Sequence, residues 1–347
     1  MSRNTLKSYL QDSFLNSLMS DIKHAGGMRS SLIDITHKCN LRCTGCYYFM
    51  EDMDQYKRVK DDKAFNAFIE QELSRGTNML TIVGGEPALV QDRLKILAKN
   101  FKLTVVTNGT IPIPVKDLED IRIAISFWGD VEQDQILRGG NDVNIFDQAL
   151  SHFKNDPRDG FYYTTIPGFT AGIEGATRRM VDNGNFVAFN FYGDLTGIGG
   201  KYSHKSGFSD SIQEISRLAK LYPRRVISSP HINRVISTRS LFGREWGYDV
   251  CPSVTYDHPE NESRMTTGKK YPTKLRAYNA DLKTTRRCCI GSARDCETCK
   301  DLWAIYGWVI GSMKDHLSTK KDFPIGYVLC IFSICKQGLL IGVKDLF

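Results

Sequence analysis

The sequence predicts an α/β fold, a partial (β/α)6 barrel followed by a cysteine-rich C-terminal extension. Short β-rich runs alternate with helical patterns between residues 31 and 230, which is typical of βαβ units on a parallel sheet. Each conspicuous glycine or polar motif directly follows one of these runs. Because the carboxyl ends of parallel strands meet at one edge, we expect a single active-site mouth there.

The expected strands are runs rich in β-branched and aromatic residues. They are SLIDIT at 31–36, MLTIV at 79–83, LTVVT at 103–107, IRIAIS at 121–126, YYTTI at 162–166 and FVAFNF at 186–191. A further short strand is expected near Val226. Such residues fit the pleated, buried surface of a sheet covered on its faces.

The expected helices lie between these runs, where apolar residues recur at helical spacing and so fall on one face. In the first helix that face carries Phe65, Phe68, Ile69 and Leu73. The others are expected around 94–97, 145–153, 177–181 and 212–218. Strand and helix therefore alternate through the whole region.

The chain divides into three expected segments: a helical segment at 1–30, the barrel at 31–235 and the cysteine-rich extension at 236–347. After about residue 235 the apolar periodicity disappears, while Arg, Lys, Thr, Tyr and five cysteines accumulate before residue 300. A segment with so little apolar pattern needs another source of order, and metal ligation is a candidate.

Composition favours a globular protein of the cytoplasm. The chain has 347 residues, 41% of them hydrophobic, and a net charge of +7 without a concentrated basic block, so there is no strong signal for nucleic acid. We expect neither a signal peptide nor a transmembrane helix. The apolar stretch at 324–343 is interrupted by Lys336 and Gln337, and either packs as a terminal element or contacts a membrane surface or apolar substrate.

Three cysteines lie together in the stretch CNLRCTGCY, directly after the first expected strand: Cys39, Cys43 and Cys46. Clustered cysteines in a reducing compartment bind metal or do redox chemistry. Three thiolates can hold three irons of a [4Fe–4S] cluster and leave the fourth iron open to a small chelating molecule. A zinc-binding module is the alternative for the same spacing.

This CxxxCxxC motif, with GGEP after the second strand, resembles the radical S-adenosylmethionine (radical SAM) superfamily. The resemblance implies that Cys39, Cys43 and Cys46 hold the cluster and that SAM chelates its open iron through amino and carboxylate groups. An electron from the cluster then cleaves SAM to methionine and a 5′-deoxyadenosyl radical. A non-catalytic iron–sulfur or zinc protein would not need the GGEP motif.

The same resemblance assigns the SAM site. GGEP would contact the methionine amino group, and residues at later strand ends would contact the ribose, the carboxylate or the adenine. Many members carry an aromatic residue before the third cysteine, where this chain has glycine, so the backbone or a following tyrosine would meet adenine. The implied positions are Gly45, Tyr47, Gly84, Gly85, Glu86, Pro87, Asn108, Ser126 and Asn190. Arg138 is either a ligand contact or a solvated helix charge.

A second cysteine group lies in the extension and provides four further thiolates: Cys251, Cys289, Cys296 and Cys299, with Cys288 as an alternative. It is somewhat similar to the SPASM/twitch and adenosylhopane-synthase types of the superfamily, which implies an auxiliary [4Fe–4S] cluster. Structural zinc and free or redox-active thiols are the alternatives. Cys330 and Cys335 are expected to be buried structural thiols.

The predicted function is reductive cleavage of SAM followed by modification of a small molecule or metabolite by the 5′-deoxyadenosyl radical. The alternative is a maturase that modifies a peptide with the help of an auxiliary cluster. Either enzyme needs an external electron donor, such as a reductase, flavodoxin or ferredoxin. The reaction outcome cannot be read from the residues.

Overall fold

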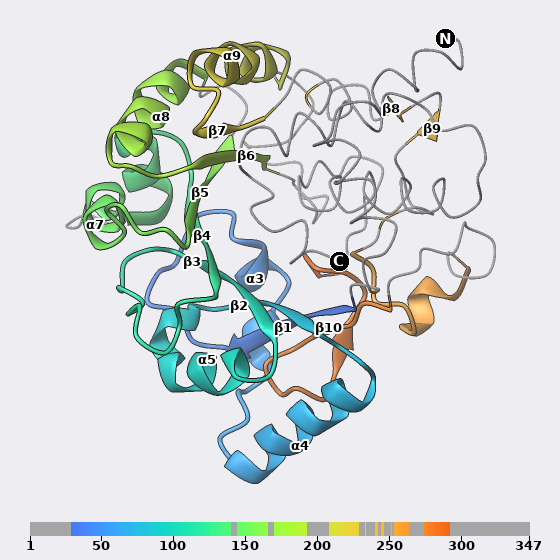
Figure 1. Ribbon diagram of the computed structural model, residues 1–347. Helices are drawn as coiled ribbons and strands as arrows, with labels where there is room; N and C mark the ends of the chain where they lie inside the picture. The colour runs from blue at the N-terminus through green and yellow to red at the C-terminus, as the bar shows by residue number, and fades with distance from the viewer. Residues whose placement is uncertain are drawn as a thin grey trace, which may run out of the picture.

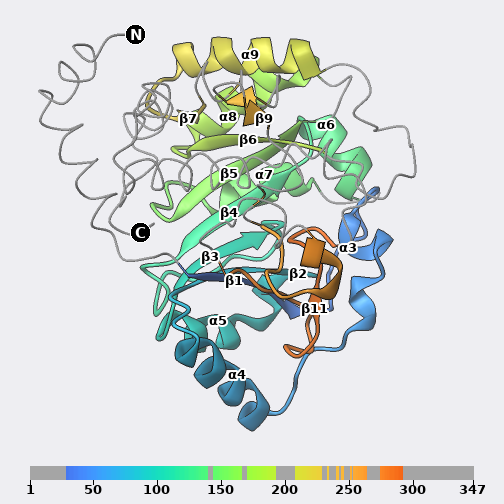
Figure 2. The same ribbon diagram turned by 90° about the vertical axis from the view of Figure 1, so that its right-hand side faces the viewer.

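A curved sheet of parallel strands organises the chain, as the computed structural model shows in Figures 1 and 2. The structure describes residues 29–139, 144–165, 170–192, 208–228, 233, 240–241, 244–245, 251, 253–263 and 274–291. The predictions for the helical segment before residue 29, for Cys296 and Cys299, and for the apolar tail fall outside these residues. Within them, no helix is long and apolar enough to cross a bilayer.

The predicted strands are confirmed, including the short one near Val226. They are β1 (Ser30–Thr36), β2 (Met79–Gly84), β3 (Lys102–Thr107), β4 (Arg122–Phe127), β5 (Asp159–Thr165), β6 (Val187–Phe191) and β7 (Val226–Ile227). Each pairs in parallel with the next, in chain order. This order matches the expected partial barrel. A separate antiparallel pair consists of β8 (Ser240–Leu241) and β9 (Arg244–Glu245).

Most of the helices form an outer layer around the sheet, seen along its lower, left and upper rim in Figure 1, whereas α3 lies inside this layer. The α-helices are α3 (Tyr47–Met50), α4 (Asp62–Ser74), α5 (Gln91–Ala98), α6 (Val131–Asp134), α7 (Ile145–His152), α8 (Ile173–Asp182) and α9 (Phe208–Leu221). Single turns of other helix types are η1 (Met53–Gln55), η2 (Pro87–Val90), η3 (Gln135–Gly139), η4 (Thr170–Gly172) and η5 (Pro259–Asn261), of which η3 is a π-turn.

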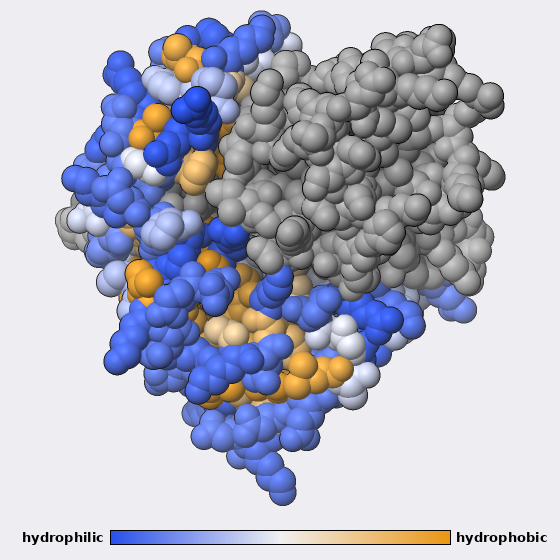
Figure 3. Space-filling model, viewed as in Figure 1, coloured by the Kyte–Doolittle hydropathy of each residue, from blue (hydrophilic) through white to orange (hydrophobic). Residues whose placement is uncertain are grey.

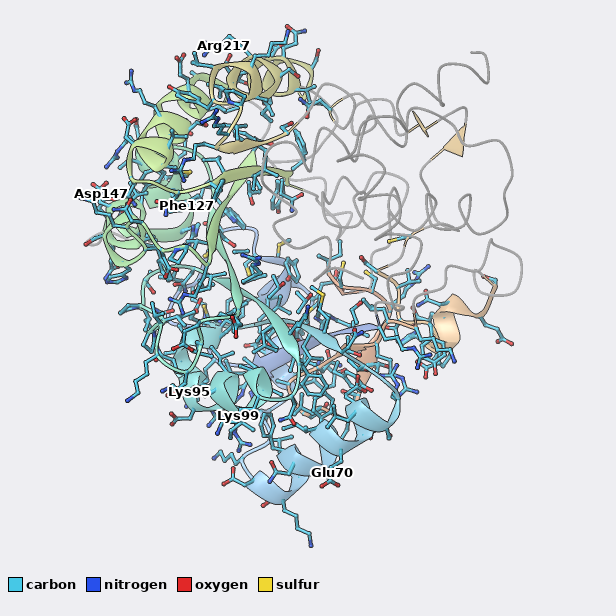
Figure 4. The ribbon with its side chains drawn as sticks, viewed as in Figure 1. Glu70, Lys95, Lys99, Phe127, Asp147 and Arg217 are labelled. Atoms are coloured by element: carbon cyan, nitrogen blue, oxygen red, sulfur yellow. The ribbon has the colours of Figure 1, made fainter. Side chains whose placement is uncertain are left out.

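Helix α4 shows how the apolar pattern becomes a packed layer. The Asp61 carboxylate caps its first turn by accepting from the amides of Lys63 and Ala64. Phe65, Phe68 and Ile69 are buried on the sheet as predicted, and burying such a side chain contributes roughly 1.5–3 kcal/mol. The prediction for Leu73 is wrong, because this residue in the last turn of the helix is exposed. The opposite face is hydrophilic: the lower end of the molecule is blue in Figure 3, and Figure 4 shows Glu70 pointing outward.

The cysteine-rich extension contributes two strands to the main sheet, which its lack of periodicity did not indicate. Strand β10 (Ala277–Tyr278) lies parallel to β1, and β11 (Thr285–Arg286) lies antiparallel to β10. Each has only two residues, too few for a period-2 pattern to be recognised. The nine strands run in the order β11-β10-β1-β2-β3-β4-β5-β6-β7.

A buried ion pair fastens this hairpin to β1. The Arg286 guanidinium donates to both carboxylate oxygens of Asp34, at 2.8 and 3.0 Å, and to the Tyr278 carbonyl at 3.0 Å. The Asp34 side chain is fully buried and that of Arg286 is 7% exposed. A bidentate pair of this kind fixes the orientation of the two side chains as well as the distance between them.

Replacing Arg286 with Met should destabilise the protein by about 3–5 kcal/mol, because a buried carboxylate loses its partner. The measurement is urea-induced unfolding of the full chain, followed by tryptophan fluorescence. Arg179→Met is the matched control, since the side chains of Arg179 and its partner Asp147 are 42% and 47% exposed, and the substitution should cost about 0–1 kcal/mol. Equal effects of the two substitutions would contradict the assigned role of Arg286.

Candidate cluster and SAM site

The first three cysteines lie on the loop between β1 and α3, at the carboxyl edge of the sheet. The Cys46 amide donates to the Cys43 carbonyl at 3.2 Å, and Cys46 is the N-terminal cap residue of α3. The Thr44 amide donates to the Leu137 carbonyl at 2.7 Å, which ties the loop to the π-turn beyond β4. Cys39, Cys43 and Cys46 are all half-buried free thiols.

The surroundings of these thiols suit thiolates that bind a cation. Burial raises the pKa of Cys39 and of Cys46 to about 11 each, and raises the pKa of the Cys43 thiol as well. Donors are nevertheless aimed at the sulfurs: the Leu41 amide lies 3.4 Å from the Cys39 Sγ, and the Arg138 guanidinium donates to Cys43. Iron would supply the positive charge that makes buried thiolates stable.

Three thiols on one loop are a donor set that suits iron in a cluster. Among the residues that the structure describes, no three His, Cys, Asp or Glu side chains are grouped so that they could hold one metal ion. In a cubane each thiolate binds a different iron, so the ligands are spread around the cluster. The donor set therefore fits a [4Fe–4S] cluster.

The GGEP motif ends β2 and lies directly against the cysteine loop. A Cβ on Gly85 would lie 2.1 Å from the Lys38 carbonyl oxygen and 2.9 Å from the Cys39 nitrogen, so only glycine fits. Gly84 has φ +115°, which glycine adopts readily. The Glu86 amide donates to the same Lys38 carbonyl at 2.8 Å. The motif thus fixes the backbone that enters the loop.

The Glu86 side chain points into the protein and links two strand ends. It is 1% exposed, and its carboxylate accepts from the Ala88 amide at 2.9 Å, the Thr107 hydroxyl at 2.6 Å and the Asn108 amide at 2.8 Å. Burial raises the pKa of this carboxyl, while the three donors act in the opposite direction. Pro87 is also buried, at the start of η2.

Asn108 follows β3 and continues the link to the cysteine loop. Its side-chain amide donates to the Asn40 Oδ1 at 2.9 Å and lies 3.9 Å from the Cys39 Sγ. Its Oδ1 accepts from both the amide and the hydroxyl of Thr110. The structure therefore brings Asn108 to the cysteine loop.

Arg138 occupies the π-turn η3 and is buried, with 1% of its side chain exposed. It pairs with Asp134 at 3.0 Å, donates to the Asn108 carbonyl at 3.0 Å and also to the Ser126 carbonyl. The prediction of a solvated helix charge is wrong, because the turn folds the guanidinium back toward Cys43. A π-turn has no sequence pattern that would have revealed this placement.

A tyrosine from the end of β6 lies against Gly45. The Tyr192 hydroxyl donates to the Gly45 carbonyl at 3.1 Å, and a Cβ on Gly45, whose φ is +76°, would lie 2.7 Å from that hydroxyl oxygen. The Tyr192 ring packs edge-on against Trp128, with ring centroids 5.6 Å apart. Asn190 lies two residues earlier in β6, and Tyr47 begins α3 on the other side of the loop. Both residues follow strands of the sheet, so sequence position places them at this edge, but it does not indicate that their rings pack together.

The second cysteine group is described in part. The Cys288 side chain is buried, with its sulfur 3.4 Å from the Gly291 carbonyl oxygen, whereas Cys251 and Cys289 are half-buried. The Cys289 amide donates to the Ser253 carbonyl at 3.0 Å, which brings the segments carrying these two cysteines together. A Cβ on Gly291 would meet η1, which follows the cysteine loop.

Comparisons with known proteins agree with this geometry. Residues 25–139 match the family described as a 4Fe-4S single cluster domain. The chain is similar to two proteins described as probable GTP 3′,8-cyclases from strains of Methanococcus maripaludis, with 29% identity over 126 residues and 28% over 125. Each match covers 33% of this chain, and the chain spans 42% of the length of these curated relatives.

Solved structures share the fold over most of the chain. Native anSMEcpe with bound AdoMet and Cp18Cys peptide has a TM-score of 0.54 at 14% identity, covering 92% of this chain and 96% of that one. A polyhistidine-tagged form of anSMEcpe with bound AdoMet has a TM-score of 0.53 at 17% identity, covering 89% and 84%. The cluster-domain match, the two motifs at adjacent strand ends and this shared fold all agree with the resemblance of the chain to the radical SAM superfamily.

Proposed function

We propose that the protein binds a [4Fe–4S] cluster through Cys39, Cys43 and Cys46 and cleaves SAM reductively on it. When bound, the reduced cluster supplies the electron that splits the sulfonium of SAM into methionine and a 5′-deoxyadenosyl radical. The protein's residues hold the cluster, orient SAM and shield the radical from water. The radical then acts on a substrate at the carboxyl edge of the sheet.

One observation carries this proposal: the three-cysteine loop is locked against GGEP, with donors aimed at its sulfurs. The close approach of Gly85 to Lys38 and to the Cys39 nitrogen packs the backbone at the first ligand, Cys39, against the end of β2. The Arg138 guanidinium provides a buried positive charge beside Cys43. A rigid set of three ligands, with one coordination position left for a small molecule, is what cleavage of a chelating substrate needs.

SAM would lie between the cysteine loop and the strand ends. The Glu86 carboxylate already accepts three hydrogen bonds from the protein. We therefore assign the methionine amino group to the backbone carbonyls of GGEP. Tyr192 and Trp128 provide an aromatic surface beside Gly45, and we assign the adenine ring to it, in place of an aromatic residue before the third cysteine. The other assigned positions are Tyr47, Gly84, Gly85, Pro87, Asn108, Ser126 and Asn190.

We further propose an auxiliary [4Fe–4S] cluster held by Cys251, Cys289, Cys296 and Cys299. Cys289 is favoured over Cys288, because the Cys288 thiol is buried against the Gly291 carbonyl. The described half of this site is anchored to the main sheet through β10 and β11.

The proposed substrate is a small molecule or metabolite, the class to which the GTP of the related cyclases belongs. A peptide is the second candidate, favoured by a different observation: the fold is shared over 92% of the chain with a protein solved with a bound peptide. Incubating the reduced protein with SAM and candidate substrates of each class, and identifying which class yields a modified product, would distinguish a small-molecule substrate from a peptide.

The reduced, reconstituted protein should convert SAM to 5′-deoxyadenosine and methionine, measured by chromatography and mass spectrometry under anaerobic conditions. Replacing Cys39, Cys43 and Cys46 together with Ala should abolish the product, because the cluster is lost. Lys63→Ala, at an exposed position on α4, is the control and should leave the yield unchanged. Absence of 5′-deoxyadenosine with every reductant tried would overturn the proposal.

Gly85→Ala should lower the iron bound per chain at least about tenfold, since the new methyl group would displace the backbone at Lys38 and Cys39 by an amount that a packed loop does not accommodate. Iron content and visible absorption are the measurements. Gly175→Ala is the matched control, because nothing lies within 4 Å of a Cβ there. That substitution should retain all iron and stabilise α8 by about 0.4–1 kcal/mol. Full iron loading of Gly85→Ala would refute the close approach.

The triple Cys→Ala variant should retain about four irons per chain, those of the auxiliary cluster. Adding Cys289→Ala should remove them, whereas adding Cys288→Ala should retain them as long as the fold persists, checked by circular dichroism. Iron falling to zero in the triple variant, with the fold intact, would exclude a second cluster.

A further inference from the structure

Three basic residues surround His37 immediately before the cysteine loop. They are Lys38, Lys57 and Arg58, and we call them the His37 basic cluster. The Arg58 amide donates to the His37 Nδ1 at 3.1 Å, which joins the two segments that carry these residues. Lys38 is next to His37 in the chain and Lys57 is next to Arg58, so this hydrogen bond brings the three basic residues to one place.

These cations have no carboxylate partner among the described residues. Lys38 and Lys57 are exposed, and the Lys57 ammonium donates to the Asp54 backbone carbonyl at 2.9 Å. Asp54 is a nearby negative charge, yet within the described part of the chain it forms no ion pair with any of the three. By contrast, the Lys95 ammonium, on another part of the surface, lies 3.0 Å from the Asp117 carboxylate. The His37 basic cluster thus keeps a local excess of positive charge.

The cluster of charges is fixed close to the proposed iron site. Lys38 directly precedes Cys39, and its carbonyl is held by the Glu86 amide and packs against Gly85. The segment that carries Lys57 and Arg58 follows α3 and runs along the edge of the molecule in Figure 2. The Val59 amide in that segment donates to the Ala280 carbonyl at 3.3 Å, beside β10.

We propose that the His37 basic cluster is the docking surface for an acidic one-electron carrier protein. This inference rests on the proposed function, because a cluster that cleaves SAM must receive an electron in every reductive cycle. The carrier, a reduced flavin or iron–sulfur protein, is oxidised by one electron, and the [4Fe–4S] cluster gains that electron. No bond is formed or broken in this step.

Charge complementarity is what selects an acidic partner. Fixed charges of one sign around a docking site raise association rates by about 10–1000-fold, and the effect decreases as salt is added. Such charges at an interface govern the association rate more than the lifetime of the complex. A carrier that must dock and leave in each cycle gains from this arrangement, because fast association does not require tight binding.

The test measures reduction of the holoprotein's cluster by flavodoxin hydroquinone in a stopped-flow instrument, without SAM. The variant K38E/K57E/R58E reverses the His37 basic cluster. The matched control K63E/K99E/K116E makes the same change in net charge at exposed positions away from it; Figure 4 shows Lys99 on the outside of α5. Photoreduced 5-deazaflavin, a small reductant, measures the intrinsic reducibility of each cluster.

At low ionic strength, the second-order rate with flavodoxin should fall about 10–100-fold in K38E/K57E/R58E and less than about threefold in the control. The difference should decrease as salt increases, and the 5-deazaflavin rate should be equal in all three proteins. If K38E/K57E/R58E loads less iron, Lys57→Glu alone serves as the variant and should slow the reaction about threefold, whereas Lys63→Glu, its single-charge control, should leave the rate unchanged.

An unchanged flavodoxin rate in the variant, or equal slowing in variant and control, would overturn the docking site and leave the proposed function standing. Failure of 5-deazaflavin to reduce the wild-type cluster would instead contradict the proposed function. The docking site and the proposed function are therefore refuted by different measurements.

Discussion

The close approach of Gly85 to the backbone of Lys38 is the constraint on which the site depends. Without a side chain at Gly85, the end of β2 touches the chain that leaves β1, and the Glu86 amide binds the Lys38 carbonyl at 2.8 Å. The Glu86 carboxylate then reaches Asn108 beyond β3. Parallel pairing fixes the strands and leaves the loops that follow them free. The contacts of Gly85 and Glu86 therefore add what the sheet does not supply, because they hold three strand ends together.

The cysteine loop gains further support from later strands. Arg138 connects the ends of β3 and β4 to Cys43, and Tyr192 connects the end of β6 to Gly45. Each contact uses a backbone carbonyl or a sulfur on the loop side, so the loop is positioned by groups far apart in sequence. A preorganised ligand set loses little conformational entropy when iron binds.

The sequence predicts the strands well because their β-branched runs are long and uninterrupted, as in LTVVT before Asn108. It also places the cysteines and GGEP at one edge, since both follow strands of a parallel sheet. It does not predict the burial of Arg138, which depends on a π-turn, nor the strands β10 and β11, which have two residues each. These features arise from tertiary contacts that leave no local pattern.

The ion pair between Arg286 and Asp34 joins the extension to β1, the strand that leads into the loop proposed to hold the cluster. Asp34 lies in β1, two residues before Thr36, whose carbonyl accepts from the Gly85 amide at 2.8 Å. Displacing β11 would leave a buried charge on the strand that carries the cysteine loop. Cys289 follows Arg286 by three residues, so its position is set by the same strand. The two cysteine groups, distant in sequence, therefore share one structural support, and a second metal site built on Cys289 would have a fixed placement relative to the first.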